Sequence, residues 1–356
     1  MPTALRSAES TLDALERLAD AGLPAQDFVE QATERMERVV PTDGLFVSAT
    51  DPETAFATGA GTVRSLPSEW CRPTWDYEFL VPDVLKYADI ARSGRTVGDV
   101  HEATGGRPER SPRFRHFSAE TGFRSEVRLA FTVAGATYGI GQLNRVGRTR
   151  FSAAEKDWLE RATRPIARGL RRTLLDPPTG APSERGPGIV LVDRDGEVVS
   201  ATREASEWLD ELDAELLASG GGLPFYAHGL ALRVRAAHED GVPAPRARLR
   251  TRRGVWLLMH GAPLAGTDQL ALIIEPAKSS DVAPLIVEAY GLSARELDVA
   301  RAIARGLRTA EVAAYLHLSP HTVRDHLKAI FEKVGVSSRG ELVHKLFAEH
   351  YATPHG

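Results

Sequence analysis

The sequence predicts a multidomain chain in which two α/β domains are followed by an all-α bundle of four helices. Three observations support this prediction. The chain of 356 residues is long enough for two or three domains. A Pro-, Gly- and Ser-rich stretch at 176–188 is typical of a linker, and a second junction lies around Ala277–Pro284. The predicted domains therefore span residues 1–175, 189–278 and 285–350.

The first domain combines helices with a small sheet. Alternation of apolar and other residues around Gly135 predicts a β-hairpin, and Ser152 with Glu155 forms a capping box that opens a long helix. Pro165 lies inside that helix and is expected to kink it, because proline lacks an N–H. The other predicted elements are helices at Ala8–Asp20 and Pro24–Val39, a strand at Gly44–Ala49, and hairpin strands at Glu126–Ala134 and Thr137–Arg145.

Aromatic residues gather between the first strand and the hairpin, in a region without a clear period. Aromatic side chains can line a pocket for a small molecule. We therefore take four of them as candidate ligand-binding residues, namely Trp75, Tyr77, Phe79 and Phe117. The alternative is that these side chains pack beneath a long loop.

The second domain begins with a hairpin and a helix. Asp195-Gly196 is a tight-turn signal between two short apolar runs. A helical pattern follows, with its apolar positions at Trp208, Leu209, Leu212 and Leu216. The predicted strands are Ile189–Val192 and Val198–Ala201 in the hairpin, then Ala231–Ala236, Arg246–Thr251, Val255–His260 and Leu270–Ile274.

Nearly every helix boundary of the last domain is marked in the sequence. Ser293 and Glu296 form a capping box, and Gly306 is placed to end the first helix. Ser319 caps the third helix, and Pro320 occupies its first position, where a missing N–H costs nothing. The other signals are Thr309 as the cap of a short helix over Ala310–Leu316, Gly335 as the end of the third helix, and Ser338 with Glu341 as the capping box of the fourth.

The third helix of this bundle has two distinct faces. At about 100° per residue, one arc is apolar and packs on the bundle; its residues are Val323, Leu327, Ile330, Phe331 and Val334. The opposite arc is polar and carries His321, Arg324, Asp325, Lys328 and Glu332. Arg or Lys can donate to guanine in the major groove, and Asp can accept from cytosine N4. The hydroxyls of Ser319 and Thr322 are placed to hold a phosphate. These features predict the recognition helix of a helix-turn-helix.

About fifty residues from Leu292 to Val343 resemble the C-terminal DNA-binding domain of the LuxR/NarL family of bacterial transcription regulators. The matching pieces are Leu292-Ser293-x-Arg295-Glu296, Ala304-x-Gly306, Glu311-Val312-Ala313, Leu318-Ser319-x-x-Thr322-Val323-Arg324-x-His326, Ile330, Lys333-x-Gly335-Val336 and Arg339. One departure is Asp325, since relatives often carry an apolar or amide side chain there. An aspartate at that position repels phosphate and narrows the choice of bases.

The resemblance implies roles for individual residues. Arg324, Asp325 and Lys328 lie where relatives read bases, and the full set of expected DNA contacts is Thr309, Ser319, His321, Thr322, Arg324, Asp325, Lys328 and Arg339. Two such domains usually meet through the fourth helix. The expected dimer contacts are therefore Leu342, Val343 and Leu346.

The two α/β domains resemble sensor modules. The order of helices, strands and hairpin in residues 1–175, with Phe151-Ser152-Ala153-x-Glu155 opening the last helix, is similar to a GAF domain. The hairpin, helix and later strands of 189–278 resemble a PAS domain. These resemblances imply that the N-terminal part senses a signal, with an unidentified small-molecule ligand at the GAF-like domain.

Composition and charge say less than the motifs do about which class of protein this is. Residues 281–356 hold nine Lys or Arg and nine Asp or Glu, and the whole chain carries a formal charge of −4. Non-specific DNA affinity should therefore be modest and depend on a local patch. The chain has 38 Arg but only 6 Lys, a bias typical of a G+C-rich bacterial genome. Arginine abundance is thus not itself evidence of nucleic-acid binding.

Several other classes of site are not supported by the sequence. There is one cysteine, Cys71, and with His101 and His116 it lacks the close spacing of metal ligands. Asp193-x-Asp195-Gly196 lacks the later ligands of a calcium loop. We therefore expect no metal and no cofactor. The absence of a long apolar run and of a charged leader predicts a cytoplasmic protein without a membrane contact.

The sequence favours a one-component transcription regulator that senses a signal through its N-terminal domains. It would bind double-stranded promoter DNA as a homodimer and act on RNA polymerase, and it would not be an enzyme. Two alternatives stay open. One is a protein-interaction module whose helix-turn-helix has lost DNA affinity, consistent with the neutral domain and with Asp325. The other is an enzyme acting on a small molecule in the GAF- or PAS-like part, for which no catalytic motif is seen.

Overall fold

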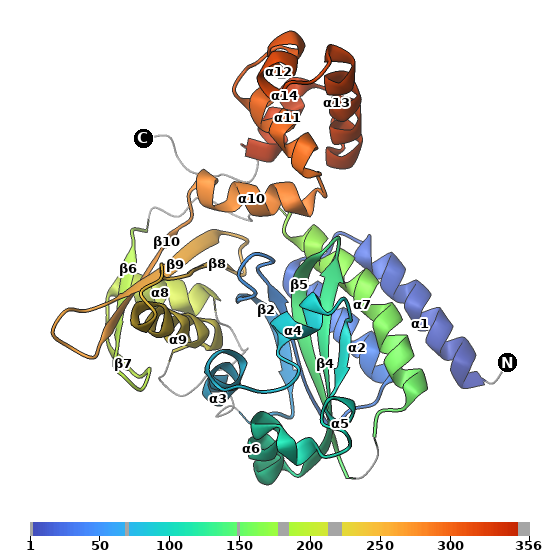
Figure 1. Ribbon diagram of the computed structural model, residues 1–356, viewed down its shortest axis with the longest axis vertical. Helices are drawn as coiled ribbons and strands as arrows, with labels where there is room; N and C mark the ends of the chain where they lie inside the picture. Colours follow the sequence, from blue (N-terminus) through green and yellow to red (C-terminus); the bar gives the residue numbers. More distant parts are fainter. Residues whose placement is uncertain (1–2, 68–70, 148–149, 177–184, 213–222, 348–356) are drawn as a thin grey trace. The chain divides into compact units, whose positions relative to one another are not determined.

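The computed structural model describes residues 3–67, 71–147, 150–176, 185–212 and 223–347, and it separates into two compact units (Figure 1). Unit 1 contains residues 1–173 and 185–276, and unit 2 contains 174–184 and 277–356. The predicted linker at 176–188 lies largely outside the described residues, as does Leu216. Among the described helices, none is long and apolar enough to cross a membrane.

Unit 1 contains two five-stranded antiparallel sheets. The first has the strand order β2-β1-β5-β4-β3. Its strands are β1 (Gly44–Thr50), β2 (Ala57–Arg64), β3 (Val97–Asp99), β4 (Phe123–Val133) and β5 (Ala136–Val146). One face is covered by three longer helices, α1 (Thr3–Ala19), α2 (Ala25–Val39) and α7 (Ala153–Thr173). The sequence-predicted helices, first strand and hairpin are confirmed within a few residues.

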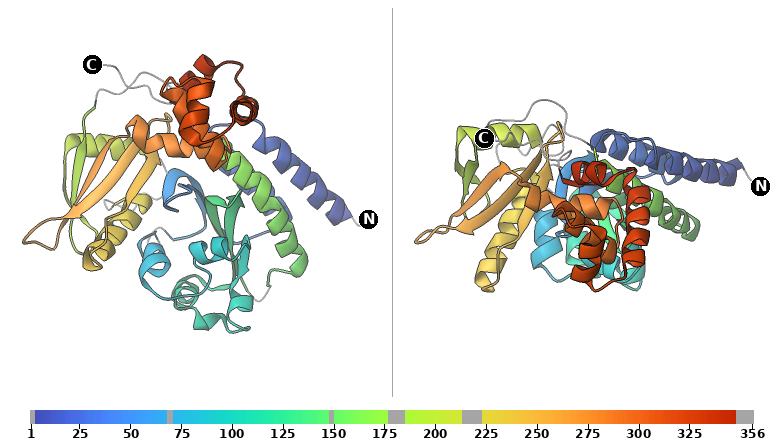
Figure 2. Two further views of the ribbon diagram at one scale, coloured as in Figure 1. Left: turned by 45° about the horizontal axis from the view of Figure 1, so that its top comes forward. Right: turned by 90° about the horizontal axis from the view of Figure 1, so that it is seen from above.

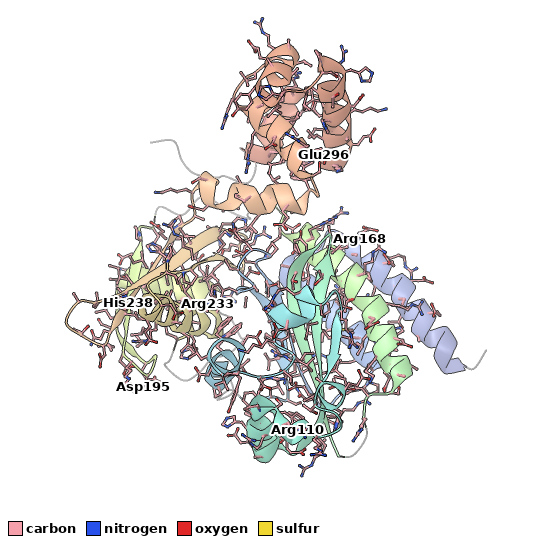
Figure 3. The ribbon with its side chains drawn as sticks, viewed as in Figure 1. Arg110, Arg168, Asp195, Arg233, His238 and Glu296 are labelled. Atoms are coloured by element: carbon pink, nitrogen blue, oxygen red, sulfur yellow. The ribbon has the colours of Figure 1, made fainter. Side chains whose placement is uncertain are left out.

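Close packing of α7 on the first sheet depends on a glycine. A Cβ added to Gly139 on β5 would lie 2.5 Å from Leu170 Cδ1 on α7, so a larger residue would push the helix away. Arg168, on the same helix, extends toward α1 (Figure 3), where its Nη1 lies 2.8 Å from Glu16 Oε2. Pro165 lies within α7, and helical structure continues on both sides of it. Packing and ion pairs thus hold α1 and α7 together against the sheet.

The opposite face of the first sheet is covered by short helical segments that the sequence did not predict. They are α3 (Cys71–Trp75), the π-helical segment η2 (Asp76–Leu80), α4 (Tyr87–Arg92), α5 (Val100–Ala103), the 3-10 segment η3 (Pro108–Arg110) and α6 (Pro112–Thr121). Strand β2 was also not predicted. It contains few large apolar residues and is held by pairing with β1, where Phe46 faces Val63. Segments this short have no sequence period to reveal them.

The second sheet of unit 1 has the order β7-β6-β10-β9-β8. Its strands are β6 (Gly188–Val192), β7 (Val198–Ala201), β8 (Arg246–Arg250), β9 (Trp256–Pro263) and β10 (Leu270–Pro276), and the helices packed on it are α8 (Arg203–Leu212) and α9 (Phe225–Glu239). The predicted hairpin, the helix containing Trp208 and the last three strands are confirmed.

The predicted strand at Ala231–Ala236 is wrong, because these residues lie inside α9. The alternation of Leu232 and Val234 with arginines suggested a strand. In the structure the buried residues follow a helical period instead; they are Ala227, Leu230, Ala231, Val234 and Ala237. Pro224, immediately before the helix, suits a helix start.

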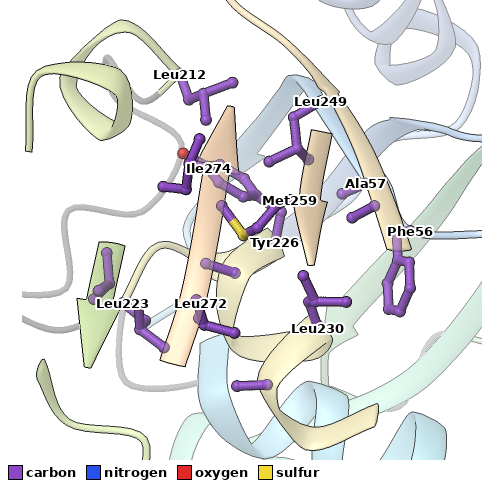
Figure 4. Close-up of a cluster of buried hydrophobic side chains, with 14 of the residues drawn as sticks. Phe56, Ala57, Leu212, Leu223, Tyr226, Leu230, Leu249, Met259, Leu272 and Ile274 are labelled. Atoms are coloured by element: carbon purple, nitrogen blue, oxygen red, sulfur yellow. The ribbon is translucent and has the colours of Figure 1, made fainter. Parts of the chain in front are cut away.

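Residues from both sheets of unit 1 contribute to one hydrophobic cluster (Figure 4). Phe56 and Trp75 from the first predicted domain join Trp208, Leu230 and Met259 from the second in one buried cluster. Unit 1 therefore contains residues from both of the predicted α/β domains in one compact unit.

In the described part of unit 2, all regular elements are helices. Its helices are α10 (Ser279–Ala289), α11 (Ala294–Ala304), α12 (Thr309–Leu316), α13 (Pro320–Val334) and α14 (Arg339–Phe347). Helices α11 to α14 form the predicted four-helix bundle (Figures 1 and 2). The junction expected at Ala277–Pro284 is largely helical, since α10 continues through Pro284.

Candidate nucleic-acid interface

A tight turn joins α12 to α13. His317 adopts a left-handed backbone conformation with φ of 54°, and the Leu318 amide donates to the Ala313 carbonyl over 2.8 Å. Ser319 Oγ then accepts from the Thr322 amide at 3.0 Å, with Pro320 at the first position of α13. The predicted cap and the predicted turn are both confirmed. They set where α13 begins and therefore which side chains its exposed face presents.

The start of α12 differs from the prediction. Thr309 is the first residue of the helix, and the residue before it, Arg308, donates its amide to Glu311 Oε2 at 2.6 Å. The Thr309 hydroxyl accepts a hydrogen bond from Arg339 Nη2 instead of capping the helix. This contact brings together two of the predicted DNA-contact residues that are thirty positions apart in the sequence.

The faces of α13 are those expected from the helical period. Val323, Leu327, Ile330 and Val334 are buried, and Phe331 is half-buried at the edge. The polar residues His321, Arg324, Asp325, Lys328 and Glu332 are exposed. The helix thus packs through its apolar arc and leaves the predicted base-reading arc accessible.

Asp325 has a partner on its own helix. Its Oδ2 lies 2.8 Å from His321 Nδ1, one turn earlier, and both side chains are more than half exposed. Arg324 and Lys328 on the same face were other candidate partners for this carboxylate. The structure places its carboxylate with His321, and among the described residues neither Arg324 nor Lys328 forms an ion pair with an acidic side chain.

A hollow of about 500 Å³ lies beside α13 in unit 2. Basic side chains from two helices border it, namely Arg324 and Lys328 of α13 and Arg339 of α14, and Thr309 also lines it. Other lining residues are Leu327, Phe331, Glu332, Gly335, Val336 and Ser337. Three of the nine cations of residues 281–356 therefore gather at one place, which is the local patch that a neutral domain needs to attract phosphate.

Helix α13 is anchored to α11 through Glu296, which Figure 3 labels on α11. Its Oε2 accepts from Lys333 Nζ on α13 at 2.7 Å and from the Ser293 amide at 2.6 Å. Burial raises the pKa of this carboxyl, but the hydrogen bonds from Lys333 and Ser293 outweigh that effect, and the net pKa is lowered. The capping box predicted at Ser293 is confirmed, and it also positions the recognition helix.

The predicted dimer contacts occupy a different environment from the one expected. Leu342 and Leu346 are completely buried inside unit 2, and Val343 is half-buried. The structure thus assigns the two leucines to the core of the unit and not to an exposed surface. Among the described residues of this helix, Gly340, Glu341 and His344 are exposed.

The four predicted ligand-binding aromatics do not gather at one place in unit 1. Trp75 is 1% exposed and stacks on Phe79, with ring centroids 5.2 Å apart. Tyr77 instead contacts Phe117 edge to face at 5.8 Å. Trp75 belongs to the shared core of the two sheets, and Phe117 to a separate small cluster. The burial of Trp75 agrees with the alternative interpretation, in which the aromatic side chain packs in the interior and does not line a ligand pocket.

A cluster of buried charged groups in unit 1 was not anticipated. Arg113 pairs with Glu126, and Arg128 with Glu78, all at most 7% exposed. Glu126 and Arg128 alternate with apolar residues along β4, a pattern that normally marks a strand with one face in water. Only the covering helical segments show that this face is interior.

Comparison with known proteins identifies the family that the C-terminal segment resembles. Residues 291–346 match the family described as bacterial regulatory proteins, luxR family. Over 56 residues the chain is 46% identical to the transcriptional regulatory protein UhpA of Salmonella typhimurium, covering 16% of this chain and 29% of that protein. Over 66 residues it is 39% identical to the probable transcriptional regulatory protein NarL of Mycobacterium tuberculosis, covering 18% and 28%. The chain thus spans under a third of the length of these relatives.

The N-terminal half is similar to solved structures only at a low level. The GAF domain of a phosphoenolpyruvate-protein phosphotransferase from Coxiella burnetii aligns with 47% of this chain and 93% of that domain, at 12% identity and a TM-score of 0.33. A score of this size does not establish a shared fold. The comparisons therefore identify the C-terminal segment as a LuxR-family helix-turn-helix domain.

Proposed function

We propose that this chain, with its LuxR-family domain at residues 291–346, is a one-component transcription regulator that binds specific promoter DNA. The observation that carries the proposal is the exposed face of α13. Its start is capped by Ser319, its apolar face is buried, and Arg324 and Lys328 project from it beside the hollow that Arg339 and Thr309 also line. Such a helix suits the major groove, with hydroxyls and cations at its edges for the phosphates.

The remaining parts of the proposal concern assembly and control. We expect two copies to bind a two-fold site, because closed symmetry matches a palindromic operator. Unit 1 would act as the sensor, as the GAF-like and PAS-like order of its elements suggests. A signal would shift the population of arrangements in which two DNA-binding units reach adjacent half-sites. RNA polymerase would be the partner at the promoter whose activity the bound regulator changes.

The proposal is tested by selecting DNA from a random library with the purified full chain and sequencing it. We expect enrichment of a palindromic site, and a loss of roughly 100-fold or more in affinity for that site in an Arg324→Ala/Lys328→Ala variant, because each base-reading contact contributes about 1–3 kcal/mol. The matched control is Arg295→Ala, an exposed arginine of α11 that pairs with Asp298. The control should select the same site as the wild type.

Two observations favour a second function. The neutral charge of residues 281–356 and the exposed carboxylate of Asp325 also suit a protein-interaction module that does not bind DNA. The same experiment separates the two functions. Absence of any salt-dependent duplex binding at low ionic strength, with the far-ultraviolet circular dichroism of a folded chain, would rule out the regulator and favour the interaction module.

A further inference from the structure

A hydrogen-bonded pair of side chains lies in the first two turns of α13. His321 follows directly after Pro320, and Asp325 comes one helical turn later. The His321 Nδ1 and Asp325 Oδ2 atoms are 2.8 Å apart, and the two side chains are 79% and 65% exposed. Arg324 and Lys328 are exposed on the same helix. The pair therefore belongs to the surface that is proposed above to meet the bases.

Helix stability does not account for this pair. A group that can become positive is favoured near the end of a helix and an acidic group near its start, whereas here His321 precedes Asp325. Exposed pairs one turn apart also add little stability, because water screens them. The start of the helix is already capped, since Ser319 Oγ accepts from the Thr322 amide at 3.0 Å. The contact is explained better by what it does at the surface.

The contact determines how the Asp325 carboxylate can be used. An ionised carboxylate only accepts hydrogen bonds, so we assign the shared proton to His321 Nδ1. This bond engages Oδ2 and leaves Oδ1 as a further acceptor. An exposed aspartate without such a partner would exchange among several rotamers. Ordering the side chain on binding would then lower its affinity for a base.

Protonation of His321 changes its charge but keeps this bond. The neutral imidazole with its proton on Nδ1 and the doubly protonated cation both donate from Nδ1. The cation places a positive charge beside the Asp325 carboxylate and so reduces the repulsion between that carboxylate and phosphate. The other ionisable side chains between the end of α12 and the end of the polar arc are exposed His317, Arg324, Lys328 and Glu332 and half-buried His326.

We propose that His321 is a positioning residue for base recognition. Its Nδ1–H holds the Asp325 carboxylate in place, so that the second oxygen can accept from the amino group of a cytosine in the major groove. The inference rests on the DNA-binding function proposed above and names how one base of the site is chosen. A direct contact between His321 and a phosphate is the alternative that the tests separate.

The first test measures base discrimination with the full chain. The DNA site that the wild type selects is compared with its single-base variants by fluorescence anisotropy. His321→Ala should lose about 2- to 10-fold of discrimination at the base pair that Asp325→Asn also affects, because the carboxylate is no longer ordered in advance. Discrimination at the other base pairs should stay as in the wild type. The control is His344→Ala, which changes an exposed histidine of α14 and should alter discrimination nowhere.

Two further variants distinguish positioning from direct contact. His321→Asn should retain most of the discrimination, because an asparagine amide can donate to the same carboxylate oxygen from nearly the position of Nδ1. In an Asp325→Asn background, His321→Ala should have almost no further effect, since residues that act through one contact are not additive. A phosphate contact would instead weaken binding to all sequences alike, with or without Asp325.

A third measurement follows the imidazole itself. Nitrogen-15 NMR of the histidine rings in the full chain, without DNA, should show the neutral His321 ring protonated on Nδ1, and Asp325→Ala should abolish this preference. His321→Asn identifies the signal by its absence. Lowering the pH from about 8 to about 5.5 should also strengthen binding to random duplex DNA, because the imidazole gains a positive charge. This increase should be smaller in His321→Asn.

The inference is overturned if His321→Ala weakens binding to every sequence equally, or if its effect persists undiminished in the Asp325→Asn background. A His321 ring that is not protonated on Nδ1, in a wild type that selects a site, would overturn the inference alone. A wild type that selects no site would overturn the regulator function as well. Failure of the positioning role and failure of the proposed function are therefore distinguishable.

Discussion

Asp325 is the residue at which the exposed face of α13 departs from a simple cationic surface. Asp325 shares the exposed face of α13 with Arg324 and Lys328, and its carboxylate lies 2.8 Å from His321 Nδ1. A carboxylate close to DNA repels phosphate, but it can accept a hydrogen bond from cytosine N4. This residue should therefore lower general affinity for duplex DNA and sharpen the choice of sequence.

Replacing Asp325 with Asn tests this account. The variant should bind random duplex DNA several-fold more tightly than the wild type, because one repulsive charge is removed. It should lose about 5- to 100-fold of discrimination at one base pair of the selected site, the equivalent of about 1–3 kcal/mol. Fluorescence anisotropy with the selected site and its single-base variants measures both effects. Asp298→Asn on α11 is the control, and equal binding by Asp325→Asn and wild type would contradict the assigned role.

At the scale of elements, α13 is held by groups at several points along its length. Ser319 caps its start, and Lys333 near its end donates to Glu296 on α11. The Glu296 carboxyl also completes the capping box of α11. One side chain therefore stabilises one helix and orients another, which links the stability of the bundle to the position of the recognition helix.

The lowered pKa of Glu296 predicts a dependence of stability on pH. A carboxyl whose pKa is lower in the folded state contributes stability above its unfolded pKa, about 4.3, and loses it as the pH falls through the folded value. At pH 7, Glu296→Gln should lower the free energy of unfolding by about 1–3 kcal/mol. Hydrogen exchange of α11 and α13 amides in the full chain should show faster opening, and the difference should shrink below about pH 4.

The control for this measurement is Glu332→Gln, which removes an exposed carboxylate of α13. It should leave the exchange of α11 amides unchanged. A difference between Glu296→Gln and the wild type that stays constant from pH 7 to pH 3 would show that the ionised carboxylate is not the stabilising form.

At the scale of the whole molecule, unit 1 joins what the sequence suggested were two sensor domains. Beside the shared core, Arg248 of β8 pairs with Asp51 from the end of β1, with Nε 2.6 Å from Oδ2 and Nη2 2.8 Å from Oδ1. Asp51 is fully buried. Burial tends to lower the pKa of Arg248, but the hydrogen bonds that its guanidinium donates to Asp51 and Glu53 raise the pKa overall. The ion pair thus joins β8 of the second sheet to the end of β1 in the first sheet.

Breaking this ion pair should separate the two parts. Asp51→Ala leaves a buried arginine without its bidentate partner and should cost about 3–5 kcal/mol. Urea unfolding followed by tryptophan fluorescence should change from one transition to two. Glu53→Gln, which alters the exposed partner of the same arginine, should cost at most about 1 kcal/mol. A single, unshifted transition in Asp51→Ala would show that the shared core alone holds unit 1 together.

Local signals in the sequence were sufficient for the DNA-binding segment. The capping box at Ser293, the cap at Ser319 and the glycine ends at Gly306 and Gly335 all appear in the structure. Each depends on residues within about four positions of one another, so the sequence alone contains the information. The exposed arc of α13 follows for the same reason, because the helical period decides which side chains share a face.

The sequence by itself therefore determined helices α11 to α14, most of their boundaries and the polar face of α13. Only the tertiary structure decided that Leu342 and Leu346 are interior, that residues 231–236 are helical, and that Glu126 and Arg128 face a covered interior. The physical reason is that burial depends on which segments pack from far along the chain. Arg248 meets Asp51 across 197 positions, and no local pattern encodes a contact of that length.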